Sequence, residues 1–213
     1  MEIANLFPTP VGIFKVPVSF KKFIPHLEKT THRIDPDHAS KEYGTRSLNS
    51  YILDLPELKE FNEYISNKIY EYSTNFLNLS IKNYKITQSW VSYKSPNQHH
   101  KTHQHPNSII SGVFYWADNA LQNPKITFTK SQQSTTWILT PQNQQKSNHN
   151  NPNYEDVIDI TLTPGSIILF PSYLPHGVEE NSTDEKRKSL AFNSIPTNRL
   201  GAEEELTEFK YKM

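Results

Sequence analysis

Apolar side chains recur at three- and four-residue steps after Pro56, and this periodicity predicts the clearest helix of the chain. The repeating positions are Leu58, Phe61, Ile65, Ile69, Tyr72 and Phe76, with Glu and Lys residues between them. Such spacing places the apolar side chains in one stripe along a helix. A single stripe is typical of a helix that packs on a sheet and turns its other face to solvent.

The sequence before this helix gives weaker signals. Residues 11–16 combine apolar and β-branched side chains between two prolines, and they predict a short strand. Residues 20–34 carry a mixed helical pattern that a proline interrupts. Residues 35–50 are polar and are expected to form a loop.

After residue 80 the pattern changes to short apolar and β-branched runs at close spacing. The expected strands cover residues 86–93, 109–116, 126–128, 135–139, 157–162, 167–170 and 189–192. Several short strands with no helical pattern between them are typical of a β-sandwich or barrel. Residues 141–154 are rich in Asn and Gln and predict an exposed loop. We therefore expect one mainly β domain, with an N-terminal strand and helices over residues 1–80 and a β core over residues 81–213.

The composition excludes several kinds of chemistry. The 213-residue chain contains no cysteine, which rules out disulfides, thiolate zinc sites, cysteine-held iron–sulfur clusters and a cysteine nucleophile. Its 22 Lys and Arg residues balance its 22 Asp and Glu residues, which argues against general nucleic-acid binding. No glycine-rich phosphate loop, targeting segment or membrane-spanning apolar run is visible. We expect a cytoplasmic protein in which any metal has nitrogen and oxygen ligands.

Histidines supply the candidate metal ligands. His103 and His105 are separated by one residue, so on a strand both side chains would share one face, with Cα atoms about 6.6–7 Å apart. Two imidazoles at this spacing can converge on one metal ion. His176 follows a strongly apolar run by a few residues and is the best-placed third ligand. Two histidines at this spacing also occur by chance, so the spacing alone does not establish a metal site. His99 and His100 are expected at the surface or at the pocket rim.

A second group of candidate residues begins eleven positions after His176. On a strand, Arg187, Ser189, Ala191 and Asn193 would share one face. The side chains other than arginine are small, so this face can line a pocket in which the guanidinium binds a carboxylate through two parallel hydrogen bonds. The alternative is a solvated charge cluster, because residues 184–188 are all charged.

Together these motifs resemble the iron(II)/2-oxoglutarate-dependent oxygenases, and more narrowly a family of short members common in marine bacteria and their phages. The matching stretches are residues 6–11, Trp90, and residues 103–108, 111–115, 164–166, 169–172, 174–176 and 187–193. They follow one another in order over most of the chain, which makes the resemblance more specific than any one motif. It implies a double-stranded β-helix, or jelly-roll, core.

The resemblance also implies roles for individual residues, with His103 and His176 as two iron ligands. The residues expected to bind the cosubstrate are Arg187, Ser189, Asn193 and Tyr115, and the arginine grips the distal carboxylate of 2-oxoglutarate. The usual non-haem iron site has two histidines and one carboxylate. Here the carboxylate's position, two after His103, holds His105. Either three histidines form the site, as the spacing favours, or an acid such as Asp118 or Glu179 completes it.

The implied function is that of an iron(II)- and 2-oxoglutarate-dependent dioxygenase that hydroxylates a substrate with release of succinate and CO2. The substrate would be a small molecule or a peptide, and a homodimer is a possible assembly. Two alternatives stay open: a cupin-like metalloprotein that needs the metal but not Arg187, and a non-catalytic jelly-roll binding module. Neither nucleic acid nor a membrane is an expected partner.

Overall fold

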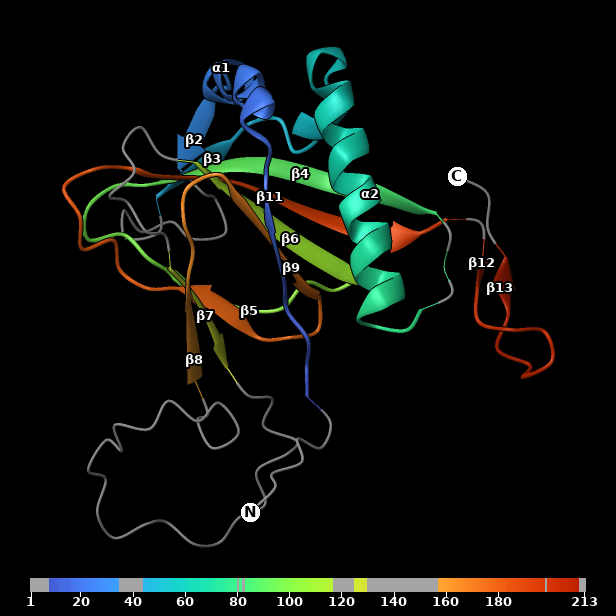
Figure 1. Cartoon of the computed structure of the whole chain (residues 1–213). Helices are drawn as coiled ribbons and strands as arrows, with labels where there is room; N and C mark the ends of the chain where they lie inside the picture. Colours follow the sequence, from blue (N-terminus) through green and yellow to red (C-terminus); the bar gives the residue numbers. More distant parts are fainter. Residues whose placement is uncertain are drawn as a thin grey trace, which may run out of the picture.

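The fold consists of two antiparallel sheets that face each other, with the helices on the outer face of the larger sheet (Figure 1). The structure is a computed structural model that describes residues 8–34, 44–79, 81, 83–116, 125–129, 157–197 and 199–210. The predicted mainly β fold with N-terminal helices and a jelly-roll core is confirmed.

The larger sheet has seven strands and begins at the N-terminal strand. Its order is β1 (Gly12–Lys15), β9 (Ser166–Pro171), β6 (Ile110–Trp116), β11 (Arg187–Pro196), β4 (Tyr84–Lys94), β3 (Thr45–Ser47) and β2 (His32–Ile34). Long antiparallel pairings of β11 with β4 and with β6 hold its centre. The strands predicted over residues 11–16, 86–93, 109–116, 167–170 and 189–192 all lie in this sheet.

The smaller sheet has four strands, in the order β5 (His100–His103), β10 (His176–Val178), β7 (Lys125–Thr129) and β8 (Val157–Thr161). β7 and β8 confirm the strands predicted over residues 126–128 and 157–162. β5 and β10 have no apolar alternation in the sequence. They are three or four residues long, and their pairing with each other and with β7 defines them.

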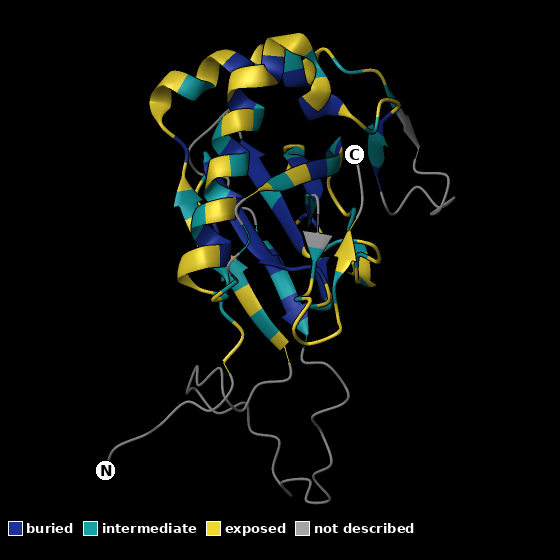
Figure 2. Cartoon of the chain, turned by 90° about the vertical axis from the view of Figure 1, so that its right-hand side faces the viewer, coloured by how far each residue is buried: buried dark blue, intermediate teal, exposed yellow. Residues whose placement is uncertain are grey.

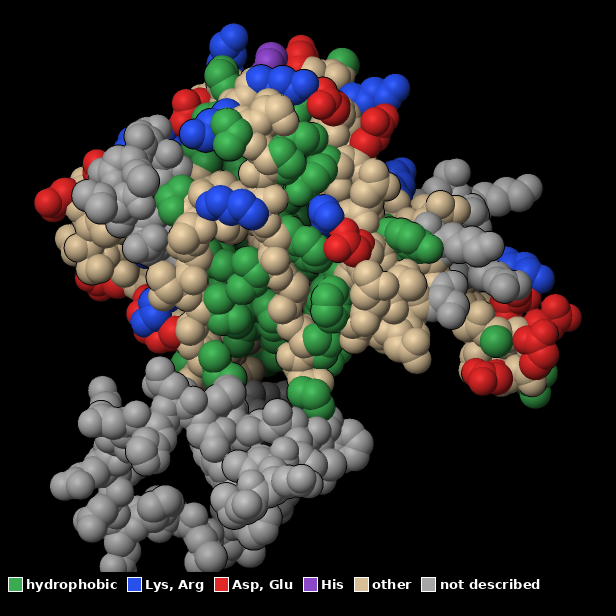
Figure 3. All heavy atoms as spheres, viewed as in Figure 1, with side chains coloured by type: hydrophobic (Ala, Val, Ile, Leu, Met, Phe, Trp, Pro, Cys, Tyr) green, Lys and Arg blue, Asp and Glu red, His purple; other side chains and the backbone are tan. Residues whose placement is uncertain are grey.

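A small hairpin follows the core, formed by β12 (Arg199–Leu200) and β13 (Phe209–Lys210). Its connection contains Glu203, Glu204 and Glu205 in succession, and Figure 3 shows acidic side chains gathered there. The next residue, Leu206, is 95% exposed. Although the net charge of the chain is zero, the β12–β13 connection is locally acidic.

The predicted amphipathic helix is confirmed as α2 (Lys59–Asn75). The side chains of its stripe that are fully buried are Phe61, Ile65, Ile69 and Tyr72. Phe76 lies at the end of the helix and is exposed. A 3-10 turn over Pro56–Leu58 precedes the helix, at a start where proline is tolerated. The weaker helical signal upstream corresponds to a 3-10 helix (Val18–Phe23) followed by α1 (Ile24–Glu28).

The two faces of the larger sheet bury different side chains, because successive residues of a strand point to opposite faces. Phe114 of β6 packs toward the helices, where its ring meets Phe61 edge-on with 5.2 Å between centroids. Tyr115, the next residue, belongs to the core between the two sheets together with Phe170. Figure 2 shows these buried strands beneath helices whose outer turns are exposed.

Gly112 in β6 allows an aromatic ring to lie directly on the strand. A Cβ atom at this position would be 2.4 Å from Cζ of Phe192 and 2.6 Å from Cδ2 of Leu169, far inside van der Waals contact. Both neighbours are fully buried side chains of the adjacent strands. Any larger residue would therefore force the ring or the strands apart.

Two local predictions before residue 50 are wrong over part of their length. The loop predicted over residues 35–50 contains β3, which pairs with both β2 and β4, and the helical pattern over residues 20–34 ends in β2. These strands have only three residues each, too few to show an alternation. The strand predicted over residues 135–139 and the loop over residues 141–154 lie outside the described residues. Within the described part of the chain, no helix is both long and apolar enough to cross a membrane.

Candidate metal and cosubstrate site

Three histidines converge where the smaller sheet faces the larger one. His103 ends β5 and His176 begins β10, and the two residues are direct antiparallel partners. His105 joins them from the segment that follows β5. The ring centroids lie 4.5 Å apart for His103 and His176, 4.8 Å for His103 and His105, and 5.0 Å for His105 and His176. One potential ligand atom from each ring lies within 4.8 Å of the others, so the group could hold a metal ion.

His105 reaches this group by a different route from the one predicted. The spacing predicts that it shares a strand face with His103, but β5 ends at His103 and the chain leaves the sheet there. Pro106, three residues further on, has no N–H with which to resume a strand ladder. The main-chain N–H of His105 instead donates to the Ser172 carbonyl at 3.1 Å. The two imidazoles meet through this turn rather than through strand periodicity.

Hydrogen bonds fix the tautomers of two of these rings. Nδ1 of His103 lies 2.8 Å from the Lys101 carbonyl, and Nδ1 of His176 lies 2.9 Å from the Leu174 carbonyl. A carbonyl oxygen can only accept, so each Nδ1 carries a proton, and in the neutral ring Nε2 keeps its lone pair. This second hydrogen bond from the ring to a main-chain carbonyl is the usual companion of metal-ligating histidine.

Burial keeps His105 and His176 neutral. Desolvation, followed by the nearby His103, lowers the pKa of His176 to about 3 and that of His105 to about 4. The hydrogen bond to Leu174 raises the pKa of His176 but does not offset its burial. Both rings are therefore unprotonated at neutral pH, the state that a metal ligand requires.

The histidines open onto a pocket between the sheets. Besides the three rings, this pocket is lined by Arg187 and Ser189 of β11 and by Tyr115 of β6. Ser189 is the direct strand partner of Tyr115 on one side and of Ser92 on the other. Six of the seven residues predicted for the site thus line one pocket.

Arg187 is the residue that the sequence predicts to bind an anionic ligand. Its Nη1 donates to the main-chain oxygen of Glu179 at 3.0 Å. Burial lowers the pKa of Arg187, and the neighbouring Tyr115 and Glu179 act in the opposite direction, so the guanidinium stays charged at neutral pH. Within the described residues, no carboxylate forms an ion pair with it. A desolvated charge in this position favours an anionic ligand.

Tyr115 offers a neutral donor beside this cation. Its side chain is 1% exposed, and burial raises the pKa of the hydroxyl to about 12, although Arg187 acts to lower it. The hydroxyl therefore keeps its proton at neutral pH and can donate to a carboxylate.

Asn193 does not line the pocket. Its Oδ1 accepts a hydrogen bond from the Ser111 hydroxyl at 2.8 Å within a buried polar cluster. Of the two acids considered as a third ligand, Asp118 lies outside the described residues. Glu179 is exposed, and its carboxylate pairs with Lys125 at 2.9 Å. The group of potential ligands among the described residues contains no carboxylate.

Several pocket residues are not among the seven predicted for the site. Trp90, Ser92 and Lys94 of β4 line the pocket, as does His100 of β5. These three β4 residues alternate along the strand and therefore share one face. Once Trp90 is assigned to the pocket, this alternation predicts that Ser92 and Lys94 line it too. His100, expected at the surface or pocket rim, lies 4.5 Å from His103 between ring centroids.

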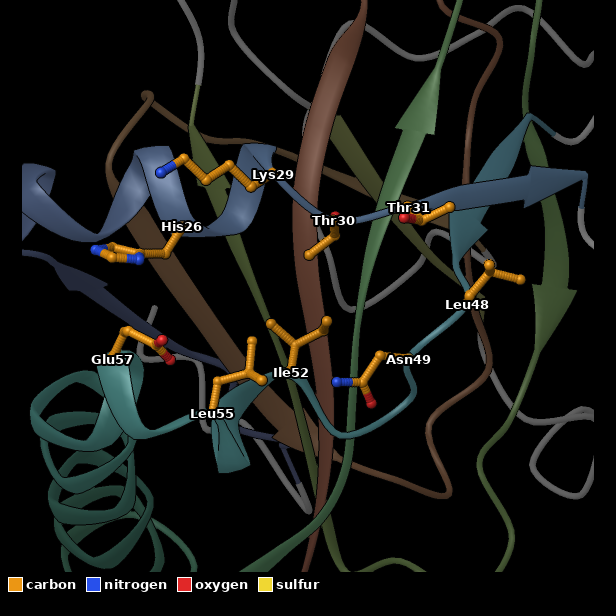
Figure 4. A pocket seen from close by; sticks show the side chains of 9 residues that line it. All are labelled: His26, Lys29, Thr30, Thr31, Leu48, Asn49, Ile52, Leu55 and Glu57. Atoms are coloured by element: carbon orange, nitrogen blue, oxygen red, sulfur yellow. The ribbon is translucent and has the colours of Figure 1, made fainter.

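A second pocket, of about 380 Å³, lies on the helical side of the larger sheet (Figure 4). α1 and the segment after it contribute His26 and Lys29, and the segment around the 3-10 helix Ile52–Asp54 contributes Ile52 and Leu55. None of the predicted site residues lines it. The pocket between the sheets is therefore the candidate functional site, although it is the smaller of the two.

The fold and the three histidines, which could hold a metal ion, are those of the jelly-roll metalloproteins. Residues 88–193 match the model of a family described as "Putative 2OG-Fe(II) oxygenase". The matched segment contains the three histidines, Arg187 and the pocket strands of the larger sheet. The chain belongs to the 2OG-Fe(II) oxygenase family, and it is an iron(II)- and 2-oxoglutarate-dependent oxygenase.

Solved structures of this class share the fold at low sequence identity. An oxidoreductase of the 2OG-Fe(II) oxygenase family from Burkholderia pseudomallei is 11% identical, with a TM-score of 0.57 over 86% of this chain and 83% of that one. HygX from Streptomyces hygroscopicus, solved with nickel, 2-oxoglutarate and hygromycin B, is 12% identical, with a TM-score of 0.60 over 89% and 84%. A Pseudomonas putida prolyl-4-hydroxylase is 9% identical, with a TM-score of 0.51 over 87% and 92%. No curated protein gives a significant match.

Proposed function

We propose that this oxygenase is a hydroxylase whose iron(II) is held by His103, His105 and His176. The observation that carries this proposal is the convergence of three imidazoles on one point beside a half-buried arginine. Imidazole nitrogen suits iron, and three protein ligands leave coordination positions open for a cosubstrate. Burial of the rings and the hydrogen bonds at Nδ1 support this donor set.

The cosubstrate would be held by Arg187, with Ser189 and Tyr115 as neutral partners. Arg187 supplies a charged fork for the distal carboxylate of 2-oxoglutarate. Tyr115 keeps its proton and donates from the adjacent strand. Asn193, which we predict as a cosubstrate residue from the sequence, would support this wall from behind through Ser111.

When bound, iron(II) and 2-oxoglutarate supply the oxidising chemistry, in which O2 is consumed, 2-oxoglutarate yields succinate and CO2, and a substrate C–H bond becomes C–OH. The protein's own residues bind and orient the reactants. Apolar side chains of the pocket, such as Phe170 and Ile126, exclude water from the site. The low pKa of His105 and His176 keeps their nitrogen lone pairs available to the metal throughout the physiological pH range.

The metal site is tested first with His176→Ala. This variant should lose stoichiometric iron(II) and produce no succinate from 2-oxoglutarate, while its thermal melt stays cooperative. His26→Ala is the matched control, because His26 lies in the second pocket and should leave both readouts unchanged. Iron binding that survives His176→Ala would remove this histidine from the site. Metal binding in the unmodified protein without succinate release would favour a metalloprotein that does not use 2-oxoglutarate.

The domain, assembly and location belong to the same proposal. We infer that residues 1–213 act as one oxygenase domain, supported by the pairing of β1 with β9 and of β3 with β4. The substrate would be a small molecule or a peptide that enters the pocket between the sheets. A cytoplasmic location and a homodimer stay predictions, and light scattering on the purified protein would measure the assembly.

A further inference from the structure

A chain of buried hydroxyl groups lies behind the histidine site. Ser172, in the turn between β9 and β10, has its Oγ 2.8 Å from Oγ of Ser111 and 2.7 Å from Oγ of Ser108. Ser111 in turn donates to Oδ1 of Asn193 at 2.8 Å. Ser172 is completely buried and Ser111 is 1% exposed. The cluster therefore joins the turn to β6 and β11 at the centre of the larger sheet.

The same turn holds two of the proposed metal ligands through its main chain. The Ser172 carbonyl accepts the N–H of His105 at 3.1 Å. Two residues later, the Leu174 carbonyl binds Nδ1 of His176 at 2.9 Å. The Leu174 N–H closes the turn on the Pro171 carbonyl at 2.9 Å, so the two anchoring carbonyls belong to one compact unit.

A further contact ties the ligand segments to this turn. The Gln104 side chain donates to the Tyr173 carbonyl, between the two anchoring carbonyls. The three consecutive carbonyls of residues 172–174 thus all accept hydrogen bonds from the ligand segments. The donors are the His105 main chain, the Gln104 side chain and the His176 ring, in that order. A displacement of the turn would move His105 and His176 relative to each other.

We propose that Ser172 is a positioning residue for the metal site, and that the Ser111–Asn193 pair anchors it. This inference rests on the proposed function, since it assigns His105 and His176 as ligands. A buried hydrogen-bonded network favours one arrangement, because breaking one of its bonds leaves a buried polar group without that partner. The Ser172 hydroxyl thereby fixes the turn to the rigid sheet, and the turn sets where the two imidazoles meet.

The structure provides a matched control for this role. Ser194 is also completely buried, and its Oγ donates to the Ile110 carbonyl at 2.8 Å. Its side chain does not bond the turn. Ser172→Ala and Ser194→Ala therefore remove equally buried hydroxyls from the same region, and both should lower the melting temperature. Only Ser172→Ala should alter the metal site.

The experiment titrates Co(II) into the metal-free full chain and follows its visible d–d absorption, which reports ligand geometry as well as affinity. Loss of a residue that orients metal ligands typically costs 10–100-fold in metal affinity. Ser172→Ala should therefore bind Co(II) at least about tenfold more weakly and with a changed spectrum. Ser194→Ala should keep the affinity and the spectrum of the unmodified protein. Asn193→Leu, which removes the acceptor of Ser111, should shift both in the direction of Ser172→Ala.

Two outcomes overturn the inference. Equal losses in Ser172→Ala and Ser194→Ala would reduce the network to a general stabilising role, and an unchanged affinity in Ser172→Ala would remove the role altogether. If Ser172→Ala fails to fold, Asn193→Leu decides between the same results. Failure of the proposed function looks different, because Co(II) binding would then be absent from the unmodified protein or insensitive to His176→Ala.

Discussion

Arg187→Ala should weaken 2-oxoglutarate binding strongly while leaving the metal site intact. Arg187 begins β11 and lines the pocket beside the histidines. Its guanidinium carries five N–H donors. Within the described residues only Nη1 has a hydrogen-bond partner, the Glu179 carbonyl. Most of its donors are therefore available to a ligand carboxylate, and none of them contacts the imidazoles that would hold the metal.

The size of the effect follows from burial. Arg187 is half-buried on the pocket wall, and partial burial lowers the pKa of its guanidinium. Truncating one partner of a buried, hydrogen-bonded charge pair costs about 2–5 kcal/mol. Because about 1.4 kcal/mol corresponds to a factor of ten, the dissociation constant of 2-oxoglutarate should rise by about 30-fold or more. Arg187→Lys keeps the charge but loses the fork, so its effect should be smaller.

The assay is an anaerobic titration of 2-oxoglutarate into iron-loaded protein. Lys188→Ala is the matched control, since it removes one positive charge from the adjacent residue on the other face of the sheet, where Lys188 pairs with Glu28 at 2.8 Å. It should leave the 2-oxoglutarate affinity near that of the unmodified protein. Equal affinities for Arg187→Ala and the unmodified protein would refute the assignment and favour a metalloprotein that does not use 2-oxoglutarate.

Three further measurements test other parts of the structure. The pKa values of His105 and His176 are about 4 and about 3 when folded, against about 6.5 when unfolded, so the unfolded chain takes up protons first as the pH falls. In urea unfolding of the metal-free protein, the free energy of unfolding should reach its full value above about pH 6.5. At pH 5 it should be lower by up to about 2 kcal/mol for each ring. A free energy of unfolding that does not change with pH would contradict the burial of these rings. Gly112→Ala should lower stability by about 1–3 kcal/mol, because its Cβ would lie 2.4 Å from Phe192, and an unchanged melting temperature would show that the strands adjust freely. Glu179→Gln should leave iron affinity unchanged, whereas a large loss would make this acid the third ligand.

Much of the fold is predictable because its elements bury continuous apolar patterns. The stripe of α2 and the apolar strands β6, β9 and β11 each carry their own periodicity, and all four are where the sequence predicts them. The strands that the sequence misses are short and polar. β3 and β10, for example, have three residues each and exist through pairing with their neighbours, which no local pattern records.

The candidate site likewise has features that a local sequence pattern predicts and features that depend on tertiary contacts. His103, His105, His176 and Arg187 are recognisable because their spacing and their neighbours form motifs. The path of the chain between the first two histidines is not predictable from a period of two, because β5 ends at His103 and the His105 N–H binds the Ser172 carbonyl instead of a strand partner. The rings that contact these histidines come partly from other strands, as Trp90 beside His105 and Phe128 beside His176 show. The identity of the site residues can therefore be predicted from the sequence, whereas their burial and their pKa values cannot.

The charge of the pocket connects these observations. Three neutral imidazoles cancel none of the charge of a bound divalent metal, unlike a site with one carboxylate. Among the described residues that line the pocket, Arg187 and Lys94 are basic and none is acidic. With a metal bound, such a pocket would attract a dianion at two places, the metal and Arg187, and each place would retain part of the affinity when the other is removed. This is why Arg187→Ala should raise the dissociation constant of 2-oxoglutarate by a finite factor rather than abolish binding, and why the third histidine and the arginine belong to one electrostatic arrangement.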